Sequence, residues 1–213
     1  MNWYKKSKIV HAKWADEVPS FDNTRPYNDR MESKNDHEDF TWDKIKKAVP
    51  WTIERSTFHQ DTRQGIDAII TGLKSGQPIS KKYVQLKMRQ YANDVSMEVI
   101  KPYPPLNPNN PWTGKDIKSE ADEFYCVDAS GVLRIFNTTT LKTAAKEIAS
   151  QLLNLNLNKP NIRNFVSTKG SAKITFDPSE QATFNQGKVQ KMLVRINPKI
   201  VKPIYTIQLD ELV

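Results

Sequence analysis

The chain has 213 residues with 32 Lys and Arg against 24 Asp and Glu, and its formal net charge of +8 favours a polyanionic partner. Its single cysteine, Cys126, excludes an internal disulfide and a cysteine-based zinc site, and the three histidines are not spaced as metal ligands. No apolar run approaches the roughly 18 residues of a membrane-spanning helix, and no signal-peptide core is present, so we expect a soluble protein of a reducing compartment with no membrane partner.

Residues 1–31 are predicted to form an N-terminal arm that mixes basic and aromatic side chains. Lys5 and Lys6 follow Trp3 closely, and Trp14 stands further along the arm. Interleaved cations and rings can hold a nucleic-acid strand by phosphate contact and base stacking. The alternative is an arm that packs its two tryptophans on the body of the protein.

Residues 32–160 are predicted to form the core, which opens with a helix from Glu32 to Val49. Acidic residues near its start and lysines near its end complement the helix dipole, and Pro50 ends it. The alternation from Trp51 to Phe58 then predicts a strand, which a polar turn follows.

The next two segments, Gly65–Ile70 and Tyr83–Arg89, read as antiparallel strands joined by a loop that contains glycine and proline. Because side chains alternate along a strand, Gln85 and Lys87 share one face of the second strand. An acid on one strand, Asp67, and Gln-x-Lys on its neighbour therefore bring a carboxylate, an amide oxygen and an ammonium to one surface.

These groups suit a metal-assisted hydrolysis. The Asp67 carboxylate, the Gln85 amide oxygen and the Leu86 carbonyl are hard oxygens that suit Mg²⁺, for which Mn²⁺ can substitute. Lys87 would position the attacking water or stabilise developing charge. The alternative is an exposed strand face on which Asp67 and Lys87 form a salt bridge worth about 0 to 1 kcal/mol.

The segment Asn93–Lys101 either extends the sheet or forms an arm, and the proline-rich segment after it is predicted to be a loop. Strands are predicted at Glu123–Asp128 and Val132–Asn137, then an amphipathic helix at Leu141–Leu153. Residues 161–213 are predicted to be a β-rich extension of the same domain, with many basic residues.

Several charged residues outside the strand pair are candidates for other roles. Lys115, Lys118 and Arg89 are candidate contacts to nucleic-acid phosphates. Asp116 belongs to an acidic patch that we expect to be solvated rather than catalytic.

The order of elements, with Gly-Ile-Asp ending at Asp67 and Val-Gln-Leu-Lys ending at Lys87, resembles the restriction-endonuclease-like PD-(D/E)XK nuclease superfamily. The hallmark of that superfamily is an acid on the second core strand and acid-x-lysine on the third. Gln85 departs from the usual acid, but Gln-x-Lys is similar to the Mrr-type branch of methylation-directed restriction nucleases. The resemblance covers about Asp36 to Leu153.

The resemblance implies an α/β (α+β) fold, a central mixed β-sheet flanked by helices, with the N-terminal arm and the C-terminal extension added. It implies a Mg²⁺-dependent DNA endonuclease that hydrolyses phosphodiester bonds through a metal-activated water, in a bacterial or phage-infected cytoplasm. The implied substrate is double-stranded or branched DNA. A homodimer is an expected arrangement, since cutting two strands commonly uses two sites.

Members of the superfamily often carry a further acid on the first helix. Glu38 is the first candidate for this acid, Glu32 the second, and Glu54 on the first strand a third. Two other functions remain open: a catalytically degenerate relative that binds nucleic acid without cutting it, and an interaction protein with no nucleic-acid role.

Overall fold

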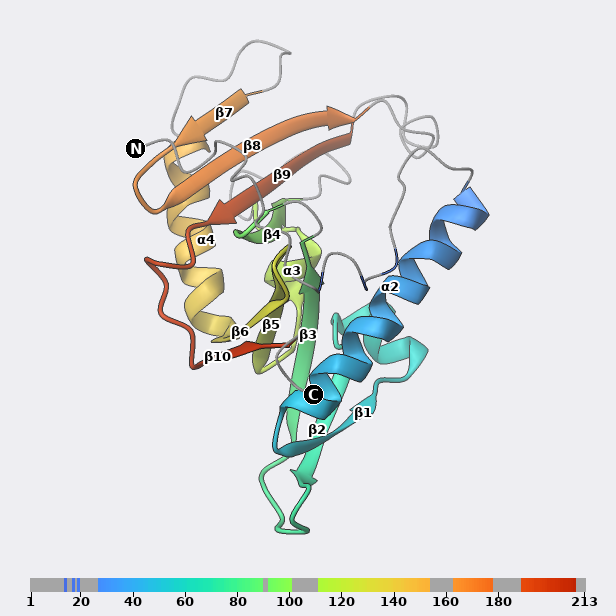
Figure 1. The fold of residues 1–213 in the computed structure, drawn as a ribbon. Helices are drawn as coiled ribbons and strands as arrows, with labels where there is room; N and C mark the ends of the chain where they lie inside the picture. Colours follow the sequence, from blue (N-terminus) through green and yellow to red (C-terminus); the bar gives the residue numbers. More distant parts are fainter. Residues whose placement is uncertain are drawn as a thin grey trace.

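The computed structural model describes Trp14, Glu17, Pro19 and residues 27–89, 92–100, 111–153, 163–177 and 189–209. This part of the chain forms two β-sheets and two long helices (Figure 1). The helices and strands are, in chain order, α2 (Tyr27–Ala48), β1 (Trp51–Arg55), the π-helical turn η1 (Gln60–Gln64), β2 (Ala68–Leu73), β3 (Lys82–Met88), β4 (Val95–Ile100), α3 (Lys115–Lys118), β5 (Glu123–Val127), β6 (Val132–Asn137), α4 (Thr138–Leu153), β7 (Arg163–Val166), β8 (Gly170–Asp177), β9 (Val189–Ile196) and β10 (Tyr205–Gln208).

The first sheet is mixed, with the strand order β1-β2-β3-β5-β6-β10. Its neighbouring strands are antiparallel except for β3 and β5, which are parallel. The predicted helix followed by three antiparallel strands is confirmed, as is the later pair of strands followed by a helix. The described chain is therefore a mixed α and β protein with a mixed central sheet.

The second sheet is antiparallel, with the order β4-β9-β8-β7. Its strand β4 falls in the segment Asn93–Lys101, and both expectations for that segment, a further strand of the first sheet or an arm, are wrong. The edge of β3 that β4 would need is already paired with β5, so β4 pairs with β9 instead. Strand β10 returns to the first sheet, so the C-terminal strands contribute to both sheets.

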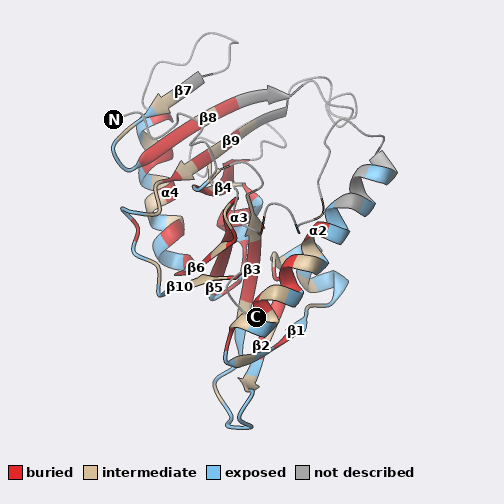
Figure 2. Cartoon of the chain, viewed as in Figure 1, coloured by how far each residue is buried: buried red, intermediate tan, exposed pale blue. Residues whose placement is uncertain are grey.

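The middle of the first sheet is covered on both faces, which explains why β5 is buried along its whole length (Figure 2). Tyr125 and Val127 pack in the cluster that contains the apolar residues of α2. Phe124 and Cys126 point the other way, into the cluster shared by α4 and the second sheet. Because side chains alternate across a strand, one strand joins both clusters into a single scaffold.

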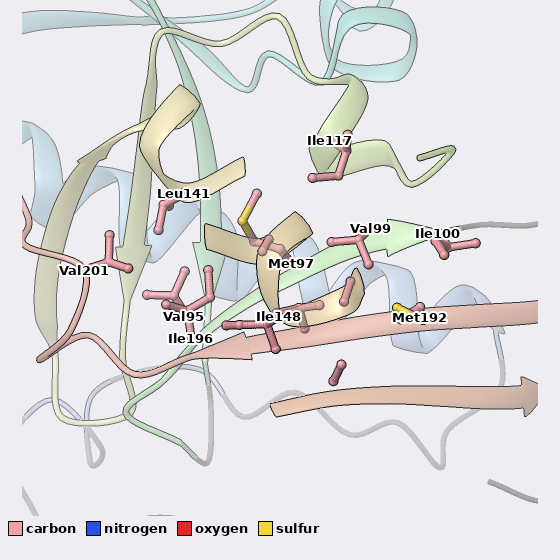
Figure 3. Packing of buried hydrophobic residues seen from close by; sticks show 14 of the residues in the cluster. Val95, Met97, Val99, Ile100, Ile117, Leu141, Ile148, Met192, Ile196 and Val201 are labelled. Carbon is pink, nitrogen blue, oxygen red and sulfur yellow. The ribbon is translucent and has the colours of Figure 1, made fainter. Parts of the chain in front are cut away.

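The cluster between α4 and the second sheet is built mainly from aliphatic and methionine side chains, with Phe124, Cys126 and Phe136 of the first sheet. Figure 3 shows Met97 of β4, Ile196 of β9 and Ile148 of α4 among them, and each is 0 % exposed. Ile117 of α3 packs at the edge of this cluster, so the short helix α3 is anchored to the second sheet. Helix α3 thus contacts β4, an edge strand of the second sheet, and also reaches β3, an interior strand of the first sheet.

Three boundaries differ from the sequence prediction. Helix α2 begins at Tyr27 rather than Glu32, and β1 ends at Arg55 because the chain then turns into η1. Gly65 closes that turn with a left-handed φ of 64°, a conformation that glycine adopts without strain. As a result β2 begins at Ala68, and Asp67 directly precedes it.

Only Trp14, Glu17 and Pro19 of the first 26 residues are described. Trp14 is buried and lies with its ring centroid 5.4 Å from that of Phe40, so the prediction that the arm packs a tryptophan on the body is confirmed for this residue. Trp3, Lys5 and Lys6 lie outside the described residues.

Replacing Gly114 with alanine is expected to lower the free energy of unfolding by about 1 to 3 kcal/mol. The added Cβ would lie 2.2 Å from the carbonyl oxygen of Glu98 and 2.5 Å from the carbonyl carbon of Val99, so α3 would have to move off β4. Gly72→Ala is a matched control, because its Cβ would lie 3.6 Å from the nearest atom, the Gln77 carbonyl oxygen. Urea unfolding measures both, and equal costs would contradict this account.

Candidate functional site

The candidate site lies where β2 begins beside β3. The carboxylate oxygen Oδ2 of Asp67 accepts a hydrogen bond of 2.6 Å from the Leu86 N–H. The Asp67 N–H donates to the carbonyl of Val84 at 2.8 Å. These two bonds clamp Asp67 onto β3, so its carboxylate is held in place although the residue lies outside the regular strand.

Burial raises the pKa of Asp67 from 3.8 to about 6. The Leu86 N–H and the charge of Lys115 favour the ionised form, while the carboxylates of Asp61 and Glu38 disfavour it. An ionised Asp67 at neutral pH is therefore a costly buried charge. Such a charge attracts a cation, which would relieve both the desolvation and the repulsion.

Gln85 and Lys87 lie on the same face of β3, as predicted, and a third residue joins them. The Gln85 Nε2 donates to Oδ1 of Asp116 at 2.7 Å, and the Lys87 Nζ lies 2.9 Å from the same oxygen. The other oxygen of Asp116 accepts a 2.7 Å hydrogen bond from the Glu98 N–H. One carboxylate thus fixes the amide and the ammonium together.

The prediction that Asp116 is solvated is wrong, because its side chain is 1 % exposed. Helix α3 packs against β4 and brings Asp116 over β3, 31 residues after Gln85 in the chain. No strand or helix period in the sequence signals this approach, since α3 is a single turn of four residues. The acidic side chain of Asp116 was the one feature of the sequence that could point to its place in the site.

The amide oxygen of Gln85 lacks the partner that its nitrogen has. Because Nε2 is engaged by Asp116, the oxygen Oε1 is turned away from that carboxylate, and it is buried with no hydrogen-bond partner among the described residues. A buried acceptor without a partner costs about 1 to 3 kcal/mol. A cation or a water beside Oε1 would remove that cost.

These oxygens fit a hard divalent cation, although with little negative charge. In the described part of the chain, no three or more His, Cys, Asp or Glu residues are placed to hold a metal. A cation would bind the Asp67 carboxylate and Gln85 Oε1, with the Leu86 carbonyl as a further ligand from β3. One carboxylate with neutral oxygens predicts weak binding.

The three candidate glutamates have different environments. The Glu38 carboxylate lies 2.6 Å from Arg55 and is close enough to Asp67 to raise its pKa. Glu54 accepts a 3.1 Å hydrogen bond from the Thr71 hydroxyl. Glu32 is exposed on α2. Glu38 is therefore the glutamate of the three that the fold brings toward Asp67.

The predicted phosphate contacts are also placed differently from one another. Lys115 is exposed beside the site, and its pKa is lowered, first by the neighbouring charge of Lys87 and then by partial burial. Lys118 is exposed at the last position of α3. Arg89 directly follows β3, with its Nε 2.8 Å from the Asp94 carboxylate. Lys115 is thus the lysine that adjoins Lys87.

Comparisons with protein-family models, with curated proteins and with solved structures found no match to this chain. Among the described helices, none is both long enough and apolar enough to cross a bilayer.

Proposed function

We propose that this protein is a Mg²⁺-dependent nuclease that hydrolyses phosphodiester bonds in DNA. The observation that carries the proposal is that the Asp67 carboxylate is hydrogen-bonded to the Leu86 N–H of β3, between Gln85 and Lys87, whose side chains are both held by Asp116. Two features favour a ligand there: the raised pKa of Asp67 and the buried Gln85 Oε1, which has no partner among the described residues. Double-stranded or branched DNA is the proposed substrate, and a dimer would supply a second site for the second strand.

In this proposal each residue has a distinct role. Asp67, Gln85 Oε1 and the Leu86 carbonyl hold the cation, which supplies Lewis acidity toward the phosphate and a more acidic water. Lys87 presents its ammonium to the water or to the phosphate oxygens. Asp116 keeps that ammonium in position through its 2.9 Å contact.

Two further residues would support the site from opposite sides. Glu38 from α2 would supply the additional acid, since its charge already acts on Asp67. Lys115 would add a second ammonium beside Lys87. A phosphate bound by both ammonium groups would relieve the repulsion between them.

A second candidate function is that of a nuclease-like protein that binds DNA without cutting it. The neutral Gln85 favours this candidate, as does the lack of a three-residue acidic cluster in the part of the chain that the structure describes. A neutral ligand binds Mg²⁺ less tightly than a carboxylate, so such a protein would keep the basic surface and lose the chemistry.

Incubation with plasmid, single-stranded and branched DNA is expected to give cleavage with Mg²⁺ or Mn²⁺ and none with EDTA. Lys87→Ala is expected to lower the cleavage rate about 10² to 10³-fold, because it removes a positioned cation at the reacting phosphate. Lys81→Ala is the matched control, because Lys81 is exposed and directly precedes the first residue of β3. This variant should cleave DNA at the normal rate.

Cleavage that persists in a variant with both Asp67→Ala and Lys87→Ala would exclude this site. Binding of DNA without cleavage in either metal would favour the second candidate. Failure to bind any nucleic acid at low salt would leave an interaction protein as the remaining class.

A further inference from the structure

The second sheet has one covered face and one basic face. Its inner face packs on α4 through buried residues such as Ala172 of β8 and Val194 of β9. The outer face therefore carries the residues between them. Three of these are cationic and partly exposed: Lys173 on β8, and Lys191 and Arg195 on β9.

The strand register sets the spacing of these three cations. Lys173 lies opposite Leu193, so it is diagonal to both Lys191 and Arg195 on the neighbouring strand. Diagonal neighbours in a sheet are about 7 to 8 Å apart, and residues four positions apart along a strand are separated by roughly 13 Å. These separations let one extended anion contact more than one of the three cations.

One residue connects this basic face to the candidate site. The Glu98 carboxylate lies 2.7 Å from the Lys191 Nζ through one oxygen and accepts the Lys115 N–H at 3.4 Å through the other. The Glu98 N–H donates to Asp116, which holds Lys87. The basic face, Lys115 and Lys87 are thus joined through two carboxylates.

We propose that Lys173, Lys191 and Arg195 form a surface that binds the phosphate backbone of DNA and leads a strand to Lys115 and the candidate site. This inference rests on the proposed function, since it names where the substrate of that site would lie. The charge of the face is complementary to a phosphodiester chain, and neutralising phosphates with Lys and Arg releases counterions. Glu98 of β4 is buried, and its carboxylate is already paired with Lys191.

The test measures binding without cleavage. The full chain carrying Asp67→Asn is titrated into fluorescently labelled single-stranded and duplex DNA in EDTA, over a series of salt concentrations. Adding Lys173→Ala and Arg195→Ala is expected to weaken binding at least tenfold at low salt. For duplex DNA the slope of log affinity against log salt is expected to fall by about two, one for each lost phosphate contact.

The control removes the same charge from other surfaces. Lys47→Ala with Lys81→Ala takes two exposed lysines from α2 and from the residue before β3, and it should leave the salt slope unchanged. Thermal unfolding checks that each variant is folded. Should the double replacement fail to fold, Lys173→Glu alone replaces it, with at least a tenfold loss expected.

Each outcome separates the two proposals. If the Lys173 and Arg195 variant binds like the control, this surface is wrong, even where cleavage with Mg²⁺ is normal. If the protein binds DNA through this surface but cuts with neither Mg²⁺ nor Mn²⁺, the nuclease proposal fails and the surface stands. Displacement of DNA by polyglutamate as effectively as by unlabelled DNA would overturn the assignment to nucleic acid.

Discussion

Asp67→Asn is expected to lower the rate of metal-dependent cleavage about 10³-fold or more. The same change is expected to raise the free energy of unfolding at pH 8 by about 1 to 3 kcal/mol. The loss follows because Asp67 is the one carboxylate of the proposed cation site that is held on β3. The gain follows because the variant removes a carboxylate that burial disfavours in its charged form. A residue that lowers stability where it lies is typical of a functional site.

The gain in stability should depend on pH in a defined direction. The folded-state pKa of Asp67 is raised to about 6, above its ordinary value of 3.8. The contribution of Asp67 to the stability of the native protein is therefore largest below pH 3.8, where this residue is protonated in both the folded and the unfolded state. That contribution is lost as the pH rises toward 6. The advantage of the neutral amide in the Asp67→Asn variant should consequently be full above about pH 7 and close to zero near about pH 4.

Urea unfolding of both proteins between about pH 4 and pH 8 measures this difference. Asp43→Asn, an exposed position on α2, is the control and should change stability little at any pH. A difference between Asp67→Asn and the native protein that stays constant over this range would contradict the buried-charge account. Cation affinity gives a second readout, because a proton competes for Asp67: the apparent affinity for Mn²⁺ should fall as the pH drops below about 6.

Asp116→Asn is expected to lower the turnover number about 10²-fold and the free energy of unfolding by about 2 to 4 kcal/mol. Asp116 accepts from Gln85 at 2.7 Å and faces the Lys87 Nζ at 2.9 Å, so an amide in its place leaves a partly buried ammonium without its counter-charge. The direction of the Gln85 amide would also be lost, because the asparagine introduced there could donate as well as accept. The KM for DNA should stay nearly constant, since no substrate contact is removed.

Asp122→Asn is a matched control for this prediction. Asp122 also accepts a backbone N–H from β3, that of Tyr83 at 2.8 Å, but it lies at the opposite end of the strand from Lys87. Its replacement should cost some stability without changing the turnover number. Mn²⁺ binding without DNA then distinguishes the role of Asp116: unchanged affinity fits a positioning residue, and lost affinity would show that it binds the cation directly.

The parts of the site that local patterns could predict lie on one strand pair. The alternation around Gln85 and Lys87 places both side chains on one face, and the structure confirms it, with Val84 and Leu86 in the opposite cluster. The placement of Asp67 beside β3 was also predicted, although β2 begins one residue later. Short-range geometry decides such features, because a strand has a period of two whatever surrounds it.

Asp116 could not be predicted in the same way. Its role depends on the packing of α3 against β4 and on the pairing of β4 with β9 in the second sheet rather than with a strand of the first. Neither event has a local signature, since an apolar strand such as β4 suits either sheet. The environment of Gln85 Oε1 follows from the same packing, because the Asp116 carboxylate orients the amide.

The sequence by itself determined the helix, the three antiparallel strands and the composition of the face that carries Gln85 and Lys87. Only the tertiary structure decided the division into two sheets, the burial of Asp116 and the joining of the basic face to the site through Glu98. The physical reason is the range of the interactions. Backbone geometry and turn residues act over a few positions, whereas burial, pairing of distant strands and the pKa of Asp67 depend on segments that meet only in the folded chain.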